Sequence, residues 1–192
     1  MAPLIIVSGP AGSGKSTLIR AALQEGRFRG RLRLAVSATT RPARQNEKDG
    51  VDYHFWSQAR FDEALAREEL LEHAKVHGLY CYGTPRGEVD GYREKGMGVL
   101  LDIDVQGAAQ VRSLYPDHVS IFVKLPRREL YEERIVKRGS ETEETLRRRL
   151  ETARKELERE GEYQHVVVND DRETAIREFS ELIAAAFDRA AP

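Results

Sequence analysis

The stretch "GPAGSGKST" (residues 9–17) follows the apolar run "LIIV" (residues 4–7) and precedes apolar residues at helical spacing. It matches the phosphate-binding pattern G-x-x-x-x-G-K-[S/T] at every fixed position. Glycines allow the backbone N–H groups of such a loop to surround a phosphate closely, and the helix that follows offers its positive end to the same anion. Because the motif lies between a predicted strand and a predicted helix, we interpret it as a loop that binds a nucleoside triphosphate.

The chemistry of such a loop predicts roles for two of its side chains. Lys15 is expected to bridge the β- and γ-phosphates, and the Ser16 hydroxyl is expected to bind Mg²⁺. The residues predicted to bind the nucleoside triphosphate are Gly9, Pro10, Ala11, Gly12, Ser13, Gly14, Lys15, Ser16 and Thr17.

Strand and helix patterns alternate along most of the chain. The predicted strands are residues 4–9, 31–40, 98–104, 119–126 and 165–170, and the predicted helices are residues 15–26, 57–74, 105–115, 127–140, 141–161 and 172–187. Within the helix of residues 57–74, Ser57 is the expected N-cap, and Ser140 with Glu143 forms an expected capping box for the helix of residues 141–161. This alternation predicts an α/β fold with three layers, in which helices cover both faces of a mostly parallel central sheet.

Residues 37–89 interrupt the alternation with aromatic residues and turns, so we interpret them as an inserted lobe. A short aromatic strand is expected near Tyr53, and residues 77–89 are expected to be rich in turns. Residues 1–36 and 90–192 then form the core that carries the phosphate loop.

Composition narrows the function classes. The 192 residues have a formal net charge of −1, which gives no reason to expect a nucleic acid or a membrane as a partner. The single cysteine, Cys81, excludes an internal disulfide and suits the cytoplasm. No apolar run is long enough for a membrane-spanning helix, and no secretory signal is visible. The sequence leaves open whether the chain is a monomer or a homo-oligomer.

Five further segments resemble guanylate kinase in order and spacing, and the resemblance covers the chain from residue 4 to about residue 183. They are "SATTRPARQNEKDGVDYHF" (37–55), "ELLEHAKVHGLYCYGT" (69–84), "LLDIDVQG" (100–107), "RIVKRGSETEETLRRRL" (134–150) and "VVVNDD" (166–171). The resemblance implies that residues 37–89 bind GMP and that residues from about 127 to 160 form a helical lid. It also implies transfer of the γ-phosphoryl group of ATP to GMP, with Mg²⁺, to give ADP and GDP.

The resemblance assigns the acceptor site residue by residue. Glu72 would accept hydrogen bonds from N1 and N2 of guanine, which adenine cannot offer as a pair, and arginines suit the dianionic phosphate because they bind it through two N–H groups at once. The implied GMP-binding residues are Ser37, Arg41, Arg44, Tyr53, Glu72, Tyr82, Thr84 and Asp104.

The resemblance also implies the catalytic groups. Arginines of the lid would neutralise charge on the transferring phosphoryl group, together with the lysine of the phosphate loop. The implied catalytic residues are Lys15, Arg134, Arg138 and Arg149. Asn169 would contact the adenine, and Asp102 would join Ser16 in binding Mg²⁺, directly or through water. The division of roles between Asp102 and Asp104 stays open.

Two departures from the family pattern are visible. "LYCY" (79–82) has one residue more than is usual, so the phosphate-binding tyrosine is aligned as Tyr82, and "KLPRREL" (124–130) adds two arginines near the lid. Two alternative functions also stay open: a related P-loop kinase of another phosphorylated small molecule, such as a ribose bisphosphate, and a non-catalytic guanylate-kinase-like module that binds proteins. The intact Lys15 argues against the second, and Glu72 argues for a nucleotide acceptor.

Overall fold

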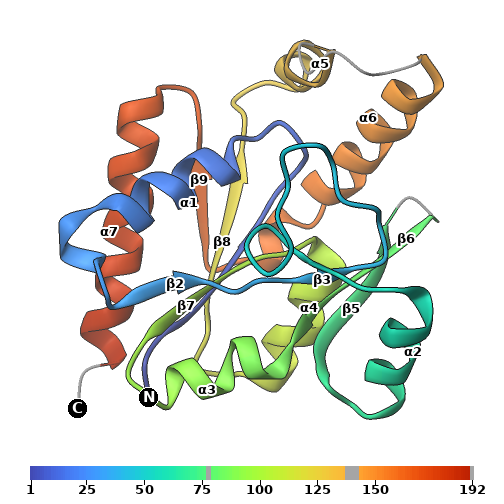
Figure 1. The fold of residues 1–192 in the computed structure, drawn as a ribbon. Helices are drawn as coiled ribbons and strands as arrows, with labels where there is room; N and C mark the ends of the chain where they lie inside the picture. Colours follow the sequence, from blue (N-terminus) through green and yellow to red (C-terminus); the bar gives the residue numbers. More distant parts are fainter. Residues whose placement is uncertain (77–78, 137–142, 191–192) are drawn as a thin grey trace.

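The computed structural model describes residues 1–76, 79–136 and 143–190. Its central sheet has five strands, all parallel, in the order β2-β7-β1-β8-β9 (Figure 1). The strands are β1 (Leu4–Ser8), β2 (Leu32–Leu34), β7 (Gly98–Asp102), β8 (Val119–Lys124) and β9 (His165–Val168). Since parallel strands all end at the same edge, the segments that follow β1, β7 and β9 meet there.

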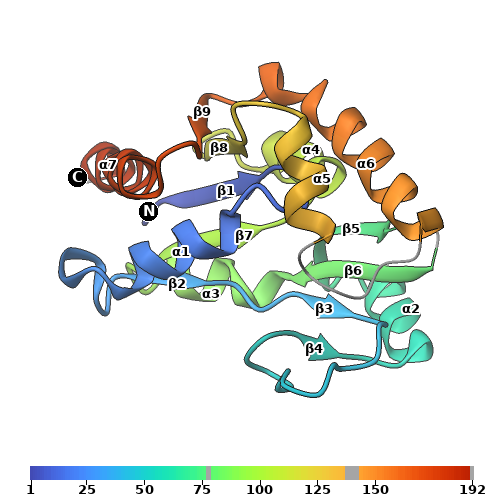
Figure 2. The same ribbon diagram turned by 90° about the horizontal axis from the view of Figure 1, so that it is seen from above.

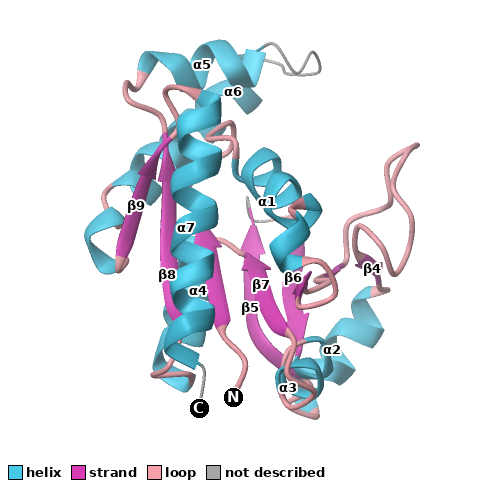
Figure 3. Ribbon diagram, turned by 90° about the vertical axis from the view of Figure 1, so that its left-hand side faces the viewer, coloured by secondary structure: helices cyan, strands magenta, loops and turns pink. Residues whose placement is uncertain are grey.

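Helices cover both faces of this sheet, as the alternation of strands and helices predicts. Side chains of β1 alternate between the two faces: Ile5 and Val7 pack in the cluster beneath α1 and α7, while Leu4 and Ile6 pack in the cluster beneath α4. The covering helices are α1 (Lys15–Gln24), α3 (Asp90–Arg93), α4 (Val105–Leu114) and α7 (Arg172–Ala190). The predicted three-layer α/β architecture is therefore confirmed (Figure 3).

A second sheet of four strands lies beside the first, in the order β4-β3-β6-β5 (Figure 2). It is mixed, because β3 runs parallel to β4 and antiparallel to β6. Its strands are β3 (Ala38–Thr39), β4 (His54–Phe55), β5 (Leu70–Val76) and β6 (Tyr80–Pro85). Helix α2 (Gln58–Ala66) covers it and buries Phe61 and Ala64 against Ala38 and Leu70.

The single strand predicted for residues 31–40 is wrong in one respect. The chain forms β2, leaves the first sheet after Leu34, and enters the second sheet as β3. The apolar and polar alternation of residues 31–36 describes the local backbone, but it does not reveal that residues 35–37 pass between two sheets.

The helix predicted for residues 57–74 is too long. Ser57 caps α2 as expected, with its hydroxyl accepting from the Arg60 N–H at 3.1 Å, but the helix ends at Ala66. Glu68 then takes a left-handed conformation (φ 55°), and residues from Leu70 onward pair with β6. Pairing with β6 and packing against α4 therefore override the helical spacing of the leucines, and β6 itself forms where the sequence indicated turns.

Helices α5 (Glu129–Val136) and α6 (Glu143–Leu157) lie over the edge at which the central strands end (Figure 3). They share a small hydrophobic cluster that includes Leu125, Tyr131 and Leu150. The predicted capping box depends on Ser140, which lies outside the described residues. Among the helices that the structure describes, none has the length and apolar composition needed to cross a membrane.

We expect Gly9→Ala to destabilise the fold much more than Gly30→Ala does. Both glycines have a positive φ (143° and 72°), but a Cβ at Gly9 would lie 2.0 Å from the Val123 carbonyl oxygen, whereas a Cβ at Gly30 meets no atom within 4 Å. Backbone strain alone should lower the free energy of unfolding by about 1–2 kcal/mol in Gly30→Ala. Strain plus overlap should lower it by more than about 3 kcal/mol in Gly9→Ala.

Urea denaturation of the two variants measures both values. Equal losses of stability would show that the loop of residues 9–14 can move away from β8 without penalty.

Candidate active site

The phosphate-binding loop connects the end of β1 to the start of α1. Gly14 is the N-cap of α1 in a left-handed conformation (φ 96°). The Lys15 ammonium turns back onto the loop, donating hydrogen bonds to the Gly9 carbonyl oxygen and, at 3.4 Å, to that of Pro10. These contacts put a positive charge over the loop, at the end of α1 where the helix dipole is also positive.

Two distant residues brace this loop. Asn169, at the end of β9 and only 6% exposed, donates from Nδ2 to the Ser13 carbonyl oxygen at 2.7 Å. A Cβ at Gly14 would lie 2.1 Å from that same Nδ2, so the glycine leaves the space that Asn169 fills. Arg134 of α5 donates to the Gly12 carbonyl oxygen at 3.4 Å. The adenine contact expected of Asn169 stays a prediction, while its amide group here holds the loop.

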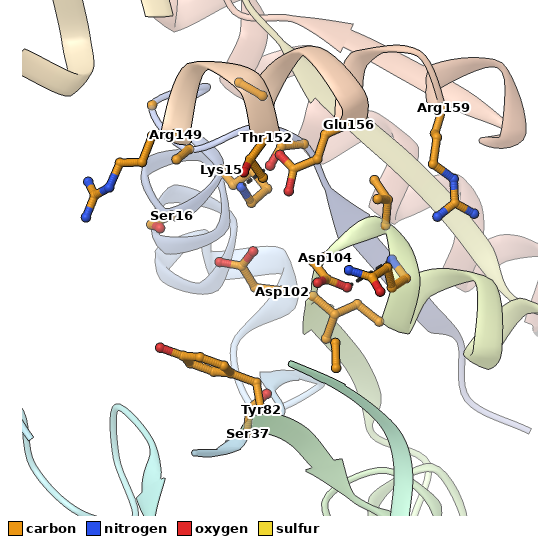
Figure 4. Close-up of a pocket in the computed structure, with 18 of the residues that line it drawn as sticks. Lys15, Ser16, Ser37, Tyr82, Asp102, Asp104, Arg149, Thr152, Glu156 and Arg159 are labelled. Carbon is orange, nitrogen blue, oxygen red and sulfur yellow. Dashed lines mark hydrogen bonds between the residues drawn. The ribbon is translucent and has the colours of Figure 1, made fainter. Parts of the chain in front are cut away.

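A cleft of about 670 Å³ separates the phosphate loop from the second sheet (Figure 4). Lys15 faces it from one side, Asp102 and Asp104 lie in the middle, and Tyr82 and Ser37 face it from the other side (Figure 4). Predicted site residues that line it are Gly9, Ala11, Gly12, Gly14, Lys15, Ser16, Thr17, Ser37, Tyr53, Glu72, Tyr82, Asp102, Asp104 and Arg149. The remaining described ones, Pro10, Ser13, Arg41, Arg44, Thr84, Arg134 and Asn169, are not among the lining residues.

Asp102, the last residue of β7, and Asp104, two residues later, differ in their surroundings. Asp104 is the N-cap of α4, and its Oδ1 accepts from the N–H groups of Gln106 and Gly107 at 2.9 and 2.8 Å. Asp102 faces the open cleft, and its carboxylate reaches solvent there. The protein around it nevertheless raises the pKa of Asp102, and the charge of Lys15 opposes that rise. Asp102 is thus the aspartate with a carboxylate available beside the phosphate loop.

Glu72 lies on β5 and is only 4% exposed. Its Oε1 accepts a hydrogen bond from the Thr84 hydroxyl at 2.7 Å, and Thr84 lies 3.4 Å from the Ser37 hydroxyl. Burial raises the pKa of the Glu72 carboxyl to about 7; the Thr84 hydrogen bond opposes the rise, and the charge of Asp104 adds to it. A buried carboxylate of this kind is stabilised by a ligand that donates hydrogen bonds to it.

An arginine and two tyrosines lie together at the other end of the second sheet. Arg41 Nε donates to the Tyr82 hydroxyl at 3.2 Å, and the rings of Tyr53 and Tyr82 meet edge to face at 5.9 Å. Of the tyrosines in residues 79–82, it is thus Tyr82 that bonds to Arg41, and its binding of a phosphate stays a prediction. Burial, with a smaller effect of the Asp102 charge, raises the pKa of Tyr53 to about 12, so its hydroxyl remains a donor at neutral pH.

Glu47 contacts both Arg41 and Arg44, and the sequence analysis did not identify it. Both of its carboxylate oxygens accept from Arg41 Nη2 at 2.9 Å, and its Oε1 lies 3.6 Å from Arg44. Burial by itself would raise the pKa of Glu47, but the Arg44 backbone N–H and the Arg41 guanidinium bring it below its ordinary value. Glu47 thus places a negative charge beside Arg41 and Arg44.

Helix α6 contributes one face to the cleft. Arg149 was predicted there, and Thr152, Ala153 and Glu156 line the cleft with it. Burial raises the pKa of Glu156 to about 7; Lys15 opposes this rise, and Asp104 adds to it. The spacing of these residues, i, i+3, i+4 and i+7, is that of one helix face, so the assignment of Arg149 could have identified them. Arg138 lies outside the described residues.

The oxygen donors near Lys15 fit a magnesium ion that is bound chiefly by its substrate. Ser16 and Asp102 line the cleft beside the phosphate loop. Within residues 1–76, 79–136 and 143–190, no group of three or more His, Cys, Asp or Glu side chains could hold a metal. One carboxylate and one hydroxyl are nevertheless sufficient for Mg²⁺, which keeps several waters and takes phosphate oxygens as further ligands.

A phosphate loop at the carboxyl edge of a parallel sheet, facing a second sheet with polar groups across a cleft, defines a P-loop phosphotransferase. Comparisons with known proteins identify the family. The family model for guanylate kinase matches residues 1–186. A guanylate kinase of Symbiobacterium thermophilum is 47% identical over 183 residues, which are 95% of this chain and 84% of that protein. One from Clostridium perfringens is 42% identical over 182 residues, 95% of this chain and 82% of the relative.

A solved structure agrees. The crystal structure of guanylate kinase from Anaplasma phagocytophilum has a TM-score of 0.75 and 30% identity, covering 97% of this chain and 86% of that one. The chain belongs to the guanylate kinase family, and it is therefore an enzyme, a nucleoside monophosphate kinase. These matches favour guanylate kinase function over both alternatives left open by the sequence.

We expect Glu72→Gln to stabilise the ligand-free protein at alkaline pH. Because the pKa of Glu72 in the folded protein is about 7 and its ordinary value is 4.5, ionisation lowers the stability of the folded state as the pH rises through this window. Below it the carboxyl is protonated in both the folded and the unfolded states. The variant should therefore gain on the order of 2–3 kcal/mol more at pH 8.5 than at pH 4.5.

Urea denaturation at the two pH values measures this difference. Glu178→Gln, at an exposed position of α7, is the matched control for the change of a carboxylate to an amide. An effect of Glu72→Gln that does not depend on pH would contradict the raised pKa.

Proposed function

We propose that this chain transfers the γ-phosphoryl group of ATP to GMP, giving ADP and GDP, with Mg²⁺ as the metal ion. The observation that carries the proposal is that Lys15 on the phosphate loop and Glu72 and Tyr82 on the second sheet line one cleft. Donor and acceptor nucleotides bound at these two sides would have their phosphates between them. Holding the acceptor phosphate in line with the γ-phosphoryl group is most of what phosphoryl transfer requires of the protein.

On the donor side, backbone N–H groups of residues 9–17 would hold the triphosphate. The Lys15 ammonium would leave the carbonyl oxygens of Gly9 and Pro10 and bind the β- and γ-phosphates instead. Mg²⁺, held by Ser16 and by Asp102 directly or through water, would neutralise phosphate charge. Asn169 would support this loop from behind and contact the adenine.

On the acceptor side, Glu72 would accept hydrogen bonds from N1 and N2 of guanine, with Thr84, Ser37 and Asp104 as its polar neighbours. The acceptor phosphate would replace the Glu47 carboxylate as the partner of the arginine pair. The residues proposed to bind that phosphate are Arg41, Arg44, Tyr53 and Tyr82. Adenine would leave the buried carboxylate of Glu72 unpaired, a loss of roughly 1–3 kcal/mol, which favours GMP over AMP.

The lid would complete the site. Arg134, Arg138 and Arg149 would approach the transferring group when α5 and α6 close over the bound nucleotides, and closure would exclude water from it. We therefore propose a division into a core (residues 1–36 and 90–192), a lid within it (about 127–160) and a GMP-binding lobe (37–89). The separate hydrophobic clusters of the second sheet and of the two lid helices support this division.

We further propose that the protein acts in the cytoplasm, without a nucleic acid or membrane partner. The near-zero net charge and the single cysteine support this proposal.

A panel of acceptors tests the function. Purified protein is incubated with ATP, Mg²⁺ and GMP, AMP or ribose 1,5-bisphosphate, and release of ADP is followed by a coupled assay. We expect turnover with GMP and at least tenfold lower kcat/KM with AMP. A preference for another acceptor, or no turnover with any, would overturn the proposal.

We expect Lys15→Ala to lower kcat by about 10²–10³-fold or more, because the ammonium group stabilises the charge of the transferring phosphoryl group. Circular dichroism and the thermal midpoint should stay close to those of the unchanged protein. The control is Lys95→Ala, which removes an exposed lysine that does not line the cleft and should keep full activity. Near-normal turnover of Lys15→Ala would refute the assigned role.

A further inference from the structure

Strand β5, which carries Glu72, lies at the edge of the second sheet. It pairs with β6 on one side only, and the backbone groups of His73 bond instead to a side chain of the core. Gln110 of α4 donates from Nε2 to the His73 carbonyl oxygen at 2.8 Å, and its Oε1 accepts from the His73 N–H at 3.2 Å. The amide of Gln110 therefore satisfies both outward backbone groups of this residue, as a neighbouring strand would.

The same helix touches the carboxylate of Glu72 itself. A Cβ at Gly107, three residues before Gln110 and so on the same face of α4, would lie 2.2 Å from Glu72 Oε2 and 2.9 Å from its Cδ. Only a glycine leaves room for the carboxylate at this position. Gly107 thus leaves space for the Glu72 carboxylate beside the first turn of α4. Gln110, in the next turn, hydrogen-bonds the backbone of His73, the residue after Glu72.

The phosphate-binding end of the second sheet has a different support. Arg41 is held by Glu47 and Tyr82, which belong to the same lobe. The base-reading carboxylate is thereby linked to the core through α4, whereas the arginine pair is organised within the lobe. A change at Gln110 should therefore affect the reading of the base and leave the binding of phosphate groups nearly intact.

We infer that Gln110 is a positioning residue for guanine recognition: by hydrogen-bonding both backbone groups of His73, it fixes Glu72 against α4 in the space that Gly107 leaves. The inference rests on the proposed function, in which Glu72 accepts hydrogen bonds from N1 and N2 of guanine. Without the amide of Gln110, the edge strand moves relative to α4, and the carboxylate no longer meets both donors in the right geometry.

The experiment compares GMP with IMP, whose hypoxanthine keeps the N1–H and lacks the 2-amino group. For Gln110→Ala at saturating ATP, we expect kcat/KM for GMP to fall about tenfold, as for the loss of two hydrogen bonds. The fall for IMP should be smaller, so the ratio of GMP to IMP decreases, while the KM for ATP stays the same. This ratio cancels the concentration of folded enzyme, so partial unfolding cannot imitate the effect.

Two further variants keep the test sharp. Gln110→Met preserves the length of the side chain without its hydrogen bonds, and it should lower the ratio as Gln110→Ala does. Ser113→Ala removes a hydroxyl that donates to the Gln110 carbonyl oxygen within α4, at 2.7 Å, and it should leave the ratio unchanged.

A double-mutant cycle with Glu72→Gln separates the possible failures. If Gln110 acts through Glu72, Gln110→Ala should lower the ratio little further in the Glu72→Gln background. If Glu72→Gln lowers the ratio and Gln110→Ala and Gln110→Met do not, or if the two effects multiply independently, the inference is overturned and the proposed function stands. If no variant changes the ratio, the base-reading role of Glu72 fails, and this inference fails with it.

Discussion

The hydrogen bond from Asn169 Nδ2 to the Ser13 carbonyl oxygen joins the last strand of the central sheet to the phosphate-binding loop, across 156 residues of sequence. A ring of backbone N–H groups can hold a phosphate only if the backbone itself is held, because each glycine that permits the loop conformation also permits others. Here β8 presses against Gly9, and Asn169 fills the space beside Gly14. The parallel sheet brings these supports to the loop because its strands end at one edge.

The second sheet differs from the phosphate loop, because it buries a carboxylate, that of Glu72, which a ligand could satisfy further. Glu72 is enclosed by Thr84, Asp104 and the first turn of α4, and its pKa of about 7 measures how poorly that site accommodates a carboxylate without further donors. A ligand with two adjacent N–H groups provides those donors. A second carboxylate, that of Glu47, accepts from Arg41 through both of its oxygens, and in the proposed function a phosphate would replace it. In the proposed function, selectivity and affinity would therefore both arise from polar groups that the nucleotide satisfies further.

The sequence predicted the core well and the second sheet poorly, for identifiable reasons. Strands β1, β7 and β8 are short apolar runs buried along most of their length, and each is followed by a helix with its own periodic pattern, so local information suffices there. Leu70 and Leu71 continue the roughly helical spacing of Phe61 and Leu65, and nothing local marks the end of α2 at Ala66. Their strand exists because β6 pairs with them and α4 covers them, and both of those elements come later in the chain.

The amino-acid sequence by itself determined the phosphate loop, the three-layer α/β core and the family, because these depend on residue types at fixed spacing. Tertiary structure alone decided which side chains support the site. Glu156 reaches the cleft through the orientation of α6, Glu47 reaches Arg41 through the loop between β3 and β4, and Gln110 reaches His73 through the packing of α4 on an edge strand. Each of these contacts joins segments that are ordinary in themselves, and only the path of the folded chain brings them together.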